Sequence, residues 1–396
     1  MRHSPPVLLL HYRKSSGADL LTETFDIAKT GLFIWIVLLV SGSVQVLYYW
    51  LLFSRFVFAR GKASTGISQP VSVIVCARNE SANLRKNLPS LLDQDYPDYE
   101  LVVVNDCSWD DTGEVLEEFA RQHPRLKVVT IVEQERYSHG KKFAVTLGIK
   151  AAKNEWLLFT DADCRPASRQ WISSMEAGFL QPYEIVLGYG AYEKGGGLLN
   201  RLIRFDTALI AMQYFACAIS GNAYMGVGRN LAYRKSMFFR NKGFAKHNHL
   251  PSGDDDLLVN ETATSKNVTV RYTPESFTYS VPRKSLSGWI SQKGRHLTTS
   301  KYYRAAHRYL LGGFATANLL FFACAILLLS AGWKPENVGY AYGAALLLKI
   351  PVFAVGASKL REKDVIAFFP LFELLLSFLQ PIFFLTQFTT KKHTWK

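Results

Sequence analysis

The stretch LLFTDADCRP, residues 157–166, runs three apolar residues into two aspartates and stops at a proline. Side chains of a strand alternate between its two faces, so Asp161 and Asp163 point the same way if strand geometry persists to the end. Two like charges that point together repel each other unless a cation lies near them. The aspartates therefore either cap the following helix or hold a hard divalent cation such as Mg²⁺ or Mn²⁺.

The sequence around this stretch alternates between short apolar runs and amphipathic segments. Strands are predicted at 71–76, 99–105, 126–132 and 155–160, and helices at about 80–93, 110–122, 140–153 and 168–180. This alternation predicts an α/β fold with a mostly parallel sheet covered on both faces. Ligands of such sheets bind beyond the carboxyl ends of the strands, where this sequence places ARNE, NDCSWDD and DADCRP. There is neither a GxGxxG fingerprint after the first strand nor a P-loop sequence, so another ligand is expected.

The apolar residues are concentrated at the two ends of the chain. Residues 31–54 carry no charge and exceed the about 20 residues that cross a bilayer. Further candidate spans follow at 309–333, 338–358 and 365–388. The net charge of +14 is typical of a multi-span protein with basic cytoplasmic segments, and no nucleic-acid-binding signature accompanies it. We therefore expect a multi-pass protein of the cytoplasmic (inner) membrane whose middle region is cytoplasmic.

The last candidate span raises a question of topology. Three C-terminal spans would leave the tail KKHTWK outside, against the charge rule. Either 365–388 is re-entrant or the tail is an exception.

Two ionisable residues, Lys349 and Glu373, lie inside the last two candidate spans. If these spans run inward and then outward, each residue is nine positions from the loop KLREKD at 359–364, which places both about 13 Å deep. We predict that they pair. The alternative is a lysine that extends to the membrane surface and an unrelated carboxyl group.

Two later segments carry further candidate site residues. In GDDDLL, acidic residues at a helix start are favoured by the helix dipole, but three exceed what capping requires. One suitably placed carboxylate among them could accept a proton from an attacking hydroxyl. In QKGRH, Gln292 and Arg295 share a helix face, and arginine suits diphosphate oxygens; by default, however, this segment is a solvated helical patch.

Seven segments, in this order, resemble those of the membrane-bound inverting glycosyltransferases of family 2, the group that contains cellulose and hyaluronan synthases. They are VSVIVCARNE, LVVVNDCSWDD, GKKFAVTLGIKAA, TDADC, GVGRNLAYRK, SGDDDL and QKGRH. The resemblance implies a GT-A fold flanked by transmembrane helices, with Mg²⁺ or Mn²⁺ as cofactor and a nucleotide-diphosphate sugar as donor, a UDP-sugar being favoured. The implied order is an N-terminal segment (1–30), a transmembrane helix (31–54), a cytoplasmic GT-A domain (65–300), three membrane segments (309–388) and a basic tail (389–396).

The resemblance also implies a set of donor-binding residues. They are Ala77, Arg78, Glu80, Asp106, Lys141, Asp161, Gln292 and Arg295. The first three border the nucleoside, Asp106 binds the base, Lys141 lies near the nucleotide and Asp161 contacts the donor sugar or ribose. The last two belong to a QxxRW motif that gates the donor diphosphate.

The remaining roles concern the metal, the base and the acceptor. Asp163 matches the metal ligand, and Asp254 matches the general base, with Asp255 as the alternative. This chain departs from the family pattern twice. Asn105 replaces an aspartate near the nucleobase, and His296 replaces the tryptophan of QxxRW on the acceptor side.

These assignments predict a single displacement that inverts the configuration of the sugar. The expected acceptor is the hydroxyl of a lipid-linked or glycan molecule at the cytoplasmic membrane face, where membrane lipids are also expected partners. Four spans are few for enclosing a channel, so a processive polysaccharide synthase would need an oligomer or a partner subunit. The alternative of another class is a non-catalytic nucleotide-binding membrane scaffold or transporter, which Lys349 and Glu373 support. No nucleic-acid partner is expected.

Overall fold

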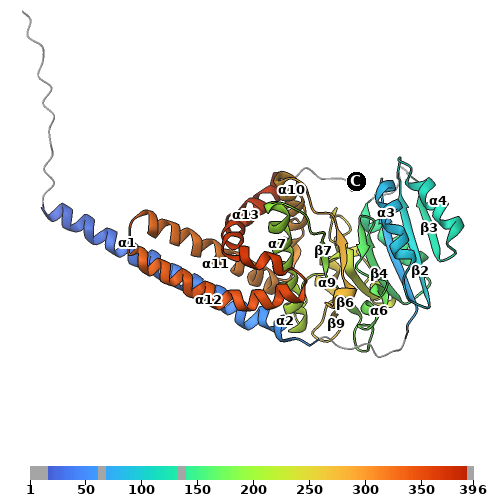
Figure 1. Ribbon diagram of the computed structural model, residues 1–396, viewed down its shortest axis with the longest axis horizontal. Helices are drawn as coiled ribbons and strands as arrows, with labels where there is room; N and C mark the ends of the chain where they lie inside the picture. Colours follow the sequence, from blue (N-terminus) through green and yellow to red (C-terminus); the bar gives the residue numbers. More distant parts are fainter. Residues whose placement is uncertain (1–16, 61–67, 133–139, 390–396) are drawn as a thin grey trace, which may run out of the picture.

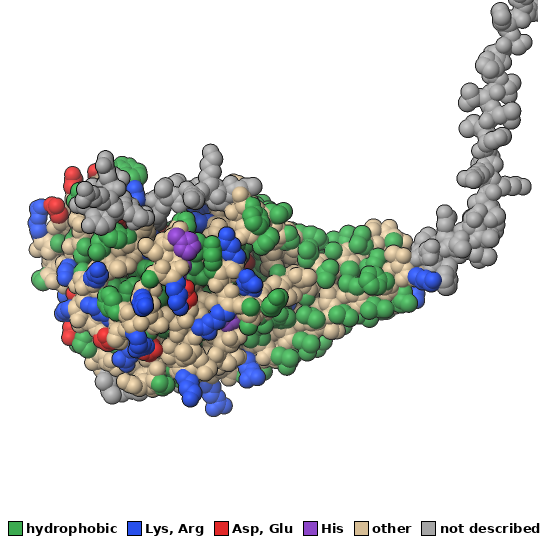
Figure 2. All heavy atoms as spheres, turned by 180° about the vertical axis from the view of Figure 1, so that it is seen from behind, with side chains coloured by type: hydrophobic (Ala, Val, Ile, Leu, Met, Phe, Trp, Pro, Cys, Tyr) green, Lys and Arg blue, Asp and Glu red, His purple; other side chains and the backbone are tan. Residues whose placement is uncertain are grey.

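A computed structural model describes residues 17–60, 68–132 and 140–389. Figure 1 shows an α/β domain at one end of the molecule and long helices that extend from it. Figure 2 shows hydrophobic side chains over the helical end, whereas the charged side chains lie mostly on the α/β domain. The two regions therefore present the surfaces that a membrane and water, respectively, would require.

The main sheet of the α/β domain has seven strands in the order β3-β2-β1-β4-β8-β6-β9. The first four strands along the chain pair in parallel, as the alternating pattern predicts. Their bounds are β1 Val71–Ala77, β2 Tyr99–Asp106, β3 Leu126–Ile131 and β4 Trp156–Asp161. The other strands are β8 Leu231–Arg234, which is antiparallel to both its neighbours, β6 Ile185–Leu187 and β9 Val268–Val270. A second sheet, in the order β5-β10-β7, comprises β5 Cys164–Pro166, β10 Thr278–Ser280 and β7 Gly190–Tyr192.

Helices cover both faces of the main sheet. Alternate side chains of β1 show this: Val73 and Val75 belong to the core under α3, α4 and α6, and Ile74 belongs to the core under α5 and α7. These helices are α3 Ser81–Leu92, α4 Thr112–Gln122, α5 Lys141–Ala151, α6 Trp171–Glu176 and α7 Leu198–Ile219. Shorter ones are α8 Lys235–Arg240, α9 Asp256–Thr262 and α10 Leu286–Leu297. The predicted α/β architecture is thus confirmed.

Within the described part of the chain, five helical segments are long and apolar enough to cross a membrane. They are Lys29–Phe58, Leu198–Ile219, Ala305–Ser330, Pro335–Lys359 and Lys363–Phe388. The first comprises the end of α1 Gly17–Leu47, the π-helix η1 Tyr48–Phe53 and α2 Ser54–Phe58. The last three contain α11 Ala305–Ser330, α12 Pro335–Lys359 and, after the 3-10 helix η6 Lys363–Phe368, α13 Phe369–Thr389.

Helix α7 is the additional candidate. Its apolar sequence is compatible with a helix on or near a membrane surface, but 78% of its most apolar part is buried inside the protein. Phe205 packs on Phe353 at a ring separation of 4.8 Å, and Phe215 packs on Phe56 at 5.4 Å. Protein, rather than lipid, therefore covers most of α7, which joins the α/β domain to the long helices.

Helix α13 begins and ends on the side of the long helices where the α/β domain lies (Figure 1). Near its start, Phe369 contacts Phe205 of α7, with the ring centroids 5.8 Å apart. Near its end, Phe383 contacts Trp289 of α10 at 5.1 Å. This path favours the re-entrant interpretation of 365–388. The tail beyond residue 389 lies outside the described residues.

The predicted pair of Lys349 and Glu373 is confirmed. Lys349 Nζ lies 2.7 and 2.8 Å from the two carboxylate oxygens of Glu373, and 2.6 Å from Gln45 Oε1. All three side chains are buried. The cluster ties α1, α12 and α13 together.

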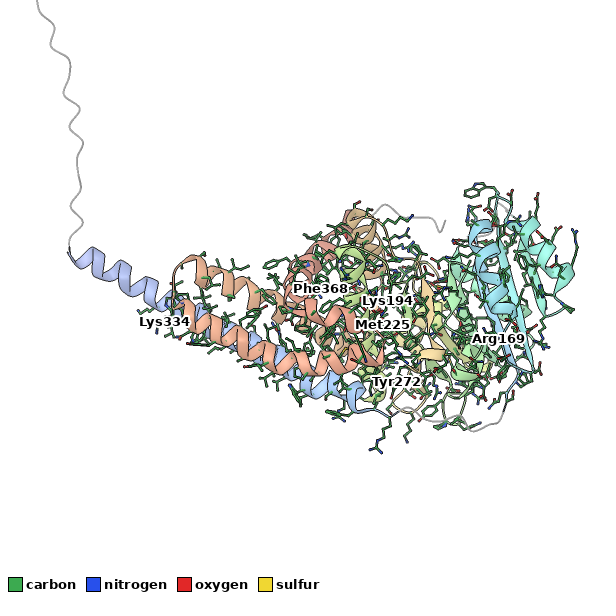
Figure 3. All side chains as sticks on the ribbon, in the orientation of Figure 1. Arg169, Lys194, Met225, Tyr272, Lys334 and Phe368 are labelled. Carbon is green, nitrogen blue, oxygen red and sulfur yellow. The ribbon has the colours of Figure 1, made fainter. Side chains whose placement is uncertain are left out.

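A second ionic cluster joins α7 to the loop between α12 and α13. The buried guanidinium of Arg204 donates to Asp364 at 2.6 and 2.8 Å and to Glu362. Lys194 adds a contact of 3.1 Å to Asp364. Figure 3 shows Lys194 and Phe368 close to this junction. The α/β domain is therefore fixed to the long helices by charge pairs as well as by aromatic packing.

Candidate active site

The acidic residues singled out in two distant segments meet at the carboxyl end of β4. Lys141, the first residue of α5, places Nζ 2.9 Å from Asp161 Oδ1 and 3.2 Å from Asp254 Oδ2. A cavity of about 20 Å³ lies beside this bridge, with Asp255 also on its wall. Desolvation lowers the pKa of Lys141, but the surrounding carboxylates outweigh it and raise this pKa well above its usual range. Lys141 therefore stays charged and holds the two aspartates together.

Asp161, Asp163 and Cys164 form a compact group whose ligand atoms all lie within 4.8 Å of one another. Burial opposes ionisation of Asp161, but Lys141 keeps the pKa of this carboxyl below its usual range. Asp163, although accessible to solvent, has a raised pKa because of desolvation and the charge of Asp161. A cation between the two carboxylates would relieve this repulsion.

Cys164 takes part in this group as a thiol. Its side chain is buried, and Sγ donates to Asp163 Oδ1 at 3.3 Å. Burial raises the pKa of Cys164 well above its usual range. A protonated thiol is a poor ligand, so the two hard carboxylates are the fitting donors for Mg²⁺ or Mn²⁺.

The three aspartates of GDDDLL have different surroundings. Asp255 caps α9, accepting from Asp256 N at 2.8 Å and from Gly228 N at 2.6 Å. Asp256 accepts from the Tyr303 hydroxyl at 2.7 Å. Burial and the charge of Asp254 raise the pKa of Asp255 to about 7. Backbone and hydroxyl groups thus engage Asp255 and Asp256, whereas Asp254 faces the cavity and pairs with Lys141.

The QKGRH segment lies on α10, as predicted, and reaches the site through Tyr192. Gln292 Nε2 donates to the Tyr192 hydroxyl at 3.4 Å, and the guanidinium carbon of Arg229 lies 4.2 Å from the Tyr192 ring centroid. Arg229 also donates to Ser280 Oγ at 2.8 Å. The positive charge of Arg229 favours the ionised forms of both Asp161 and Asp163, so it lies within electrostatic reach of both, although desolvation and Asp161 still raise the pKa of Asp163 overall.

Arg229 is a site residue to which the sequence analysis gives no role. Strand β8 pairs antiparallel with β4, with Phe159 opposite Leu231. Arg229 lies in the 3-10 turn Gly228–Asn230 directly before β8, and Thr160 Oγ1 donates to the Arg229 carbonyl at 3.0 Å. The available signal was an arginine placed just before a buried strand in GVGRNLAYRK.

Arg295 and His296 occupy the exposed side of α10. The surrounding protein and the positive charges of Arg295 and Lys293 lower the pKa of His296, although its side chain is accessible to solvent. His296 also contributes to the electrostatic environment of Asp161. The structure therefore places a neutral imidazole near the aspartates, and Arg295 beside it.

The residues predicted at the nucleoside lie in two interlocked loops after β1 and β2. Asn79, in the left-handed region at φ 55°, donates its N–H to Ser108 Oγ at 3.0 Å. Its Oδ1 accepts from Trp109 N at 3.0 Å. Arg78 lies over the exposed Trp109 ring, 5.6 Å from its centroid. These loops form an exposed cationic and aromatic surface.

The other nucleoside-side residues lie deeper. Ala77 ends β1 and is buried, and Asp106 ends β2 and is fully buried. Glu80 is half-buried, and its pKa is raised by desolvation and by the charges of Asp163 and Asp161. The structure thus gathers Glu80 with the strand-end aspartates, while Asp106 lies beneath the surface.

Comparison with known proteins identifies the domain that carries this site. Residues 72–239 match the model of the family described as "Glycosyl transferase family 2". The chain carries a family 2 glycosyltransferase domain. The GT-A fold is supported by a solved mannosyltransferase, PcManGT from Pyrobaculum calidifontis in complex with GDP-Man and Mn²⁺. That likeness has a TM-score of 0.58 and 20% identity, and it covers 85% of this chain and 97% of the other.

Curated relatives are similar to this chain over shorter lengths. "Probable glycosyltransferase YdaM" of Bacillus subtilis strain 168 is 26% identical over 258 residues, which is 59% of this chain and 55% of the relative. A poly-beta-1,6-N-acetyl-D-glucosamine synthase of Staphylococcus epidermidis is 34% identical over 93 residues, which is 24% of this chain and 21% of the relative. The chain thus spans about half or less of the length of these relatives.

Proposed function

We propose that this glycosyltransferase moves a sugar from a nucleotide-sugar donor to a lipid-linked or glycan acceptor at the cytoplasmic membrane face, with inversion. The observation that carries the proposal is the bridge from Asp161 through Lys141 to Asp254. This bridge places a donor-side carboxylate and a candidate base at one cavity beyond the strand ends, where open α/β sheets bind ligands. The long apolar helices attached to the domain support a location next to a membrane.

In the proposed mechanism, Asp254 accepts the proton of the acceptor hydroxyl as the oxygen attacks the anomeric carbon. The new glycosidic bond forms as the bond from the anomeric carbon to the donor diphosphate breaks. Arg295, which lies on α10, and Lys141 supply positive charge that stabilises the leaving diphosphate. A single displacement of this kind inverts the configuration of the sugar.

A divalent cation fits the two strand-end carboxylates. Asp163 and Asp161 present hard oxygen ligands, and their mutual repulsion is reflected in the raised pKa of Asp163. When bound, Mg²⁺ or Mn²⁺ would neutralise charge on the diphosphate of the donor. Asp163 is the more accessible of the two and is proposed as the principal ligand.

Binding of Mn²⁺ should raise the melting temperature of the wild-type protein, because a ligand that binds only the folded state stabilises it. At about 100 times its Kd, the ion would contribute about 2.7 kcal/mol. Asp163→Asn should lose most of this shift, while Asp98→Asn, at an exposed position that forms an ion pair with Lys153 at 3.8 Å, should keep it. Thermal unfolding with and without Mn²⁺ makes the measurement. An equal shift in Asp163→Asn would exclude this carboxylate as a ligand.

The direct test of function is release of nucleoside diphosphate by the purified, detergent-solubilised protein. A panel of nucleotide sugars is tested with Mn²⁺, Mg²⁺ or EDTA, and membrane lipid extract is supplied as acceptor. We expect metal-dependent release from one donor, with a UDP-sugar as the first candidate. Absence of release from every donor, with lipid extract present, would contradict the proposed function.

The transporter interpretation has lost its main support. Lys349 and Glu373 pair with each other and with Gln45 in a closed, buried cluster. Such a cluster is explained by packing between α1, α12 and α13, so it does not require an ion pathway.

The length of the glycan product formed in the diphosphate-release reaction separates single transfer from processive synthesis.

A further inference from the structure

A groove lies outside the candidate active site, between α1 and α11 on the surface of the long helices. Its volume is about 540 Å³, within the range typical of small-molecule sites. Apolar side chains form most of its wall, with a basic residue at one end; among the lining residues are Ile36, Val40, Arg308, Gly312, Thr316 and Leu320. Along α11 the groove extends from Arg308 to Leu320, about 18 Å at the rise of an α-helix.

Small residues on α11 create this groove. Gly312 and Ala317 remove side-chain volume from the wall, and a Cβ built at Gly312 meets nothing within 4 Å. Two hydrogen bonds fix α1 against α11: Gln45 Nε2 donates to the Ala317 carbonyl at 3.1 Å, and the Tyr48 hydroxyl donates to the Leu310 carbonyl at 2.7 Å. The groove is therefore a fixed feature of the packed pair of helices.

The end of the groove nearest the α/β domain is basic. Residues 276–335 contain no aspartate or glutamate. Within this range Lys301, Arg304 and Arg308 lie at or just before the start of α11, where the groove ends. Arg308 is exposed at the groove, and its guanidinium donates to the Lys301 carbonyl at 3.1 Å. An apolar channel that ends in an arginine complements an apolar chain with a phosphate headgroup.

The basic end is also joined to the acidic motif of the active site. Tyr303, just before α11, donates to Asp256 at 2.7 Å. In the first turn of α11, His307 Nδ1 lies 3.0 Å from Asn260 Nδ2, and the Arg304 N–H donates to Asn260 Oδ1 at 3.0 Å. Helix α9, which contains Asn260, begins directly after Asp255. The position of Arg308 is therefore coupled to that of the candidate base.

We propose that this groove binds the hydrocarbon chain of the acceptor, and that the acceptor is a long-chain lipid phosphate whose phosphate contacts Arg308. The proposal rests on the proposed function and specifies its acceptor class. Between two membrane helices, lipid is the available apolar occupant. The basic end selects a phosphate-bearing headgroup, and the link to α9 keeps that headgroup near the acidic motif.

Photolabelling tests the site without requiring turnover. The probe is an isoprenyl monophosphate with a diazirine in its chain, added to the full-length protein in nanodiscs of zwitterionic lipid. We expect peptides of α1 and α11 to be labelled, and excess unlabelled isoprenyl monophosphate to compete. Labelling confined to other helices would overturn the proposal.

Two variants sharpen this test. Gly312→Phe places a ring in the groove from a position where a Cβ meets nothing within 4 Å, and it should abolish labelling of α11. Gly343→Phe is the matched control, because Gly343 lies on α12, also has nothing within 4 Å and does not line the groove. Arg308→Gln should weaken probe binding by about tenfold or more, the loss expected for a charge-assisted hydrogen bond. Unchanged labelling in both Gly312→Phe and Arg308→Gln would overturn the proposal.

A second probe separates the acceptor from ordinary bilayer lipid. A diazirine-bearing phosphatidylglycerol that labels the groove equally, and competes equally with the isoprenyl phosphate, would make this a general lipid site and overturn the proposal. Release of nucleoside diphosphate by the wild-type protein is measured separately. Release without groove labelling defeats only the groove proposal, whereas labelling without release from any donor defeats the proposed function and, with it, the acceptor assignment.

Discussion

Asp254→Asn should lower the rate of sugar transfer by about a hundredfold to ten-thousandfold, the usual contribution of a general base. Asparagine has nearly the shape of aspartate but cannot accept the acceptor proton. In the structure, Asp254 faces the cavity and pairs with Lys141 at 3.2 Å. Asp161, at 2.9 Å, still neutralises Lys141 in the variant, so we expect the domain to fold.

The measurement is kcat for nucleoside diphosphate release in the presence of acceptor, with Asp98→Asn as the control for loss of one surface carboxylate. Asp255→Asn is informative in a different way. Asp255 accepts from two backbone N–H groups, so its replacement should mainly lower the melting temperature. If Asp254→Asn retained activity within about threefold while Asp255→Asn lost it, the base assignment would pass to Asp255.

Much of the fold follows from local signals in the sequence. The strands β1 to β4 are mostly apolar runs of six to eight residues between amphipathic helices, and this pattern predicts a parallel sheet. By contrast, β6, β8 and β9 have only three or four residues, too few for a recognisable period. Helix α7 shows another limit. Hydropathy registers apolar side chains but cannot tell whether lipid or protein covers them.

Some residues of the candidate site could also be predicted from local sequence signals, and others could not. Asp161, Asp163 and Asp254 are recognisable because clustered acidic residues at a strand end or helix start exceed what capping needs. Lys141 bridges Asp161 and Asp254 because α5 packs against the segment before α9. No local sequence pattern predicts this packing. Arg229 was missed for the same reason, because its position near Asp161 depends on the antiparallel pairing of β8 with β4.

The Lys349–Glu373 pair gives the second large effect, this time on stability. Lys349→Met should lower the free energy of unfolding by about 3–5 kcal/mol, because it leaves a carboxylate buried without its partner. Both side chains are almost completely buried, and the ammonium also contacts Gln45 Oε1 at 2.6 Å. Unfolding in mixed micelles by SDS titration measures the loss. Lys334→Met, at an exposed lysine at the far end of the helices (Figure 3), should change stability by about 0.5 kcal/mol or less.

A double-mutant cycle shows whether the two residues act as a pair. In Lys349→Met/Glu373→Leu no unpaired charge remains, so the loss should be smaller than in Lys349→Met alone. Gln45 Oε1 would still lack its donor, a cost of about 1–3 kcal/mol, so recovery should be incomplete. If the losses of unfolding free energy in the two single variants simply add in the double variant, Lys349 and Glu373 stabilise the helices independently. Losses that cancel in large part would show that the pair persists because either charge alone is unfavourable inside the membrane helices, which makes it a structural feature of these helices.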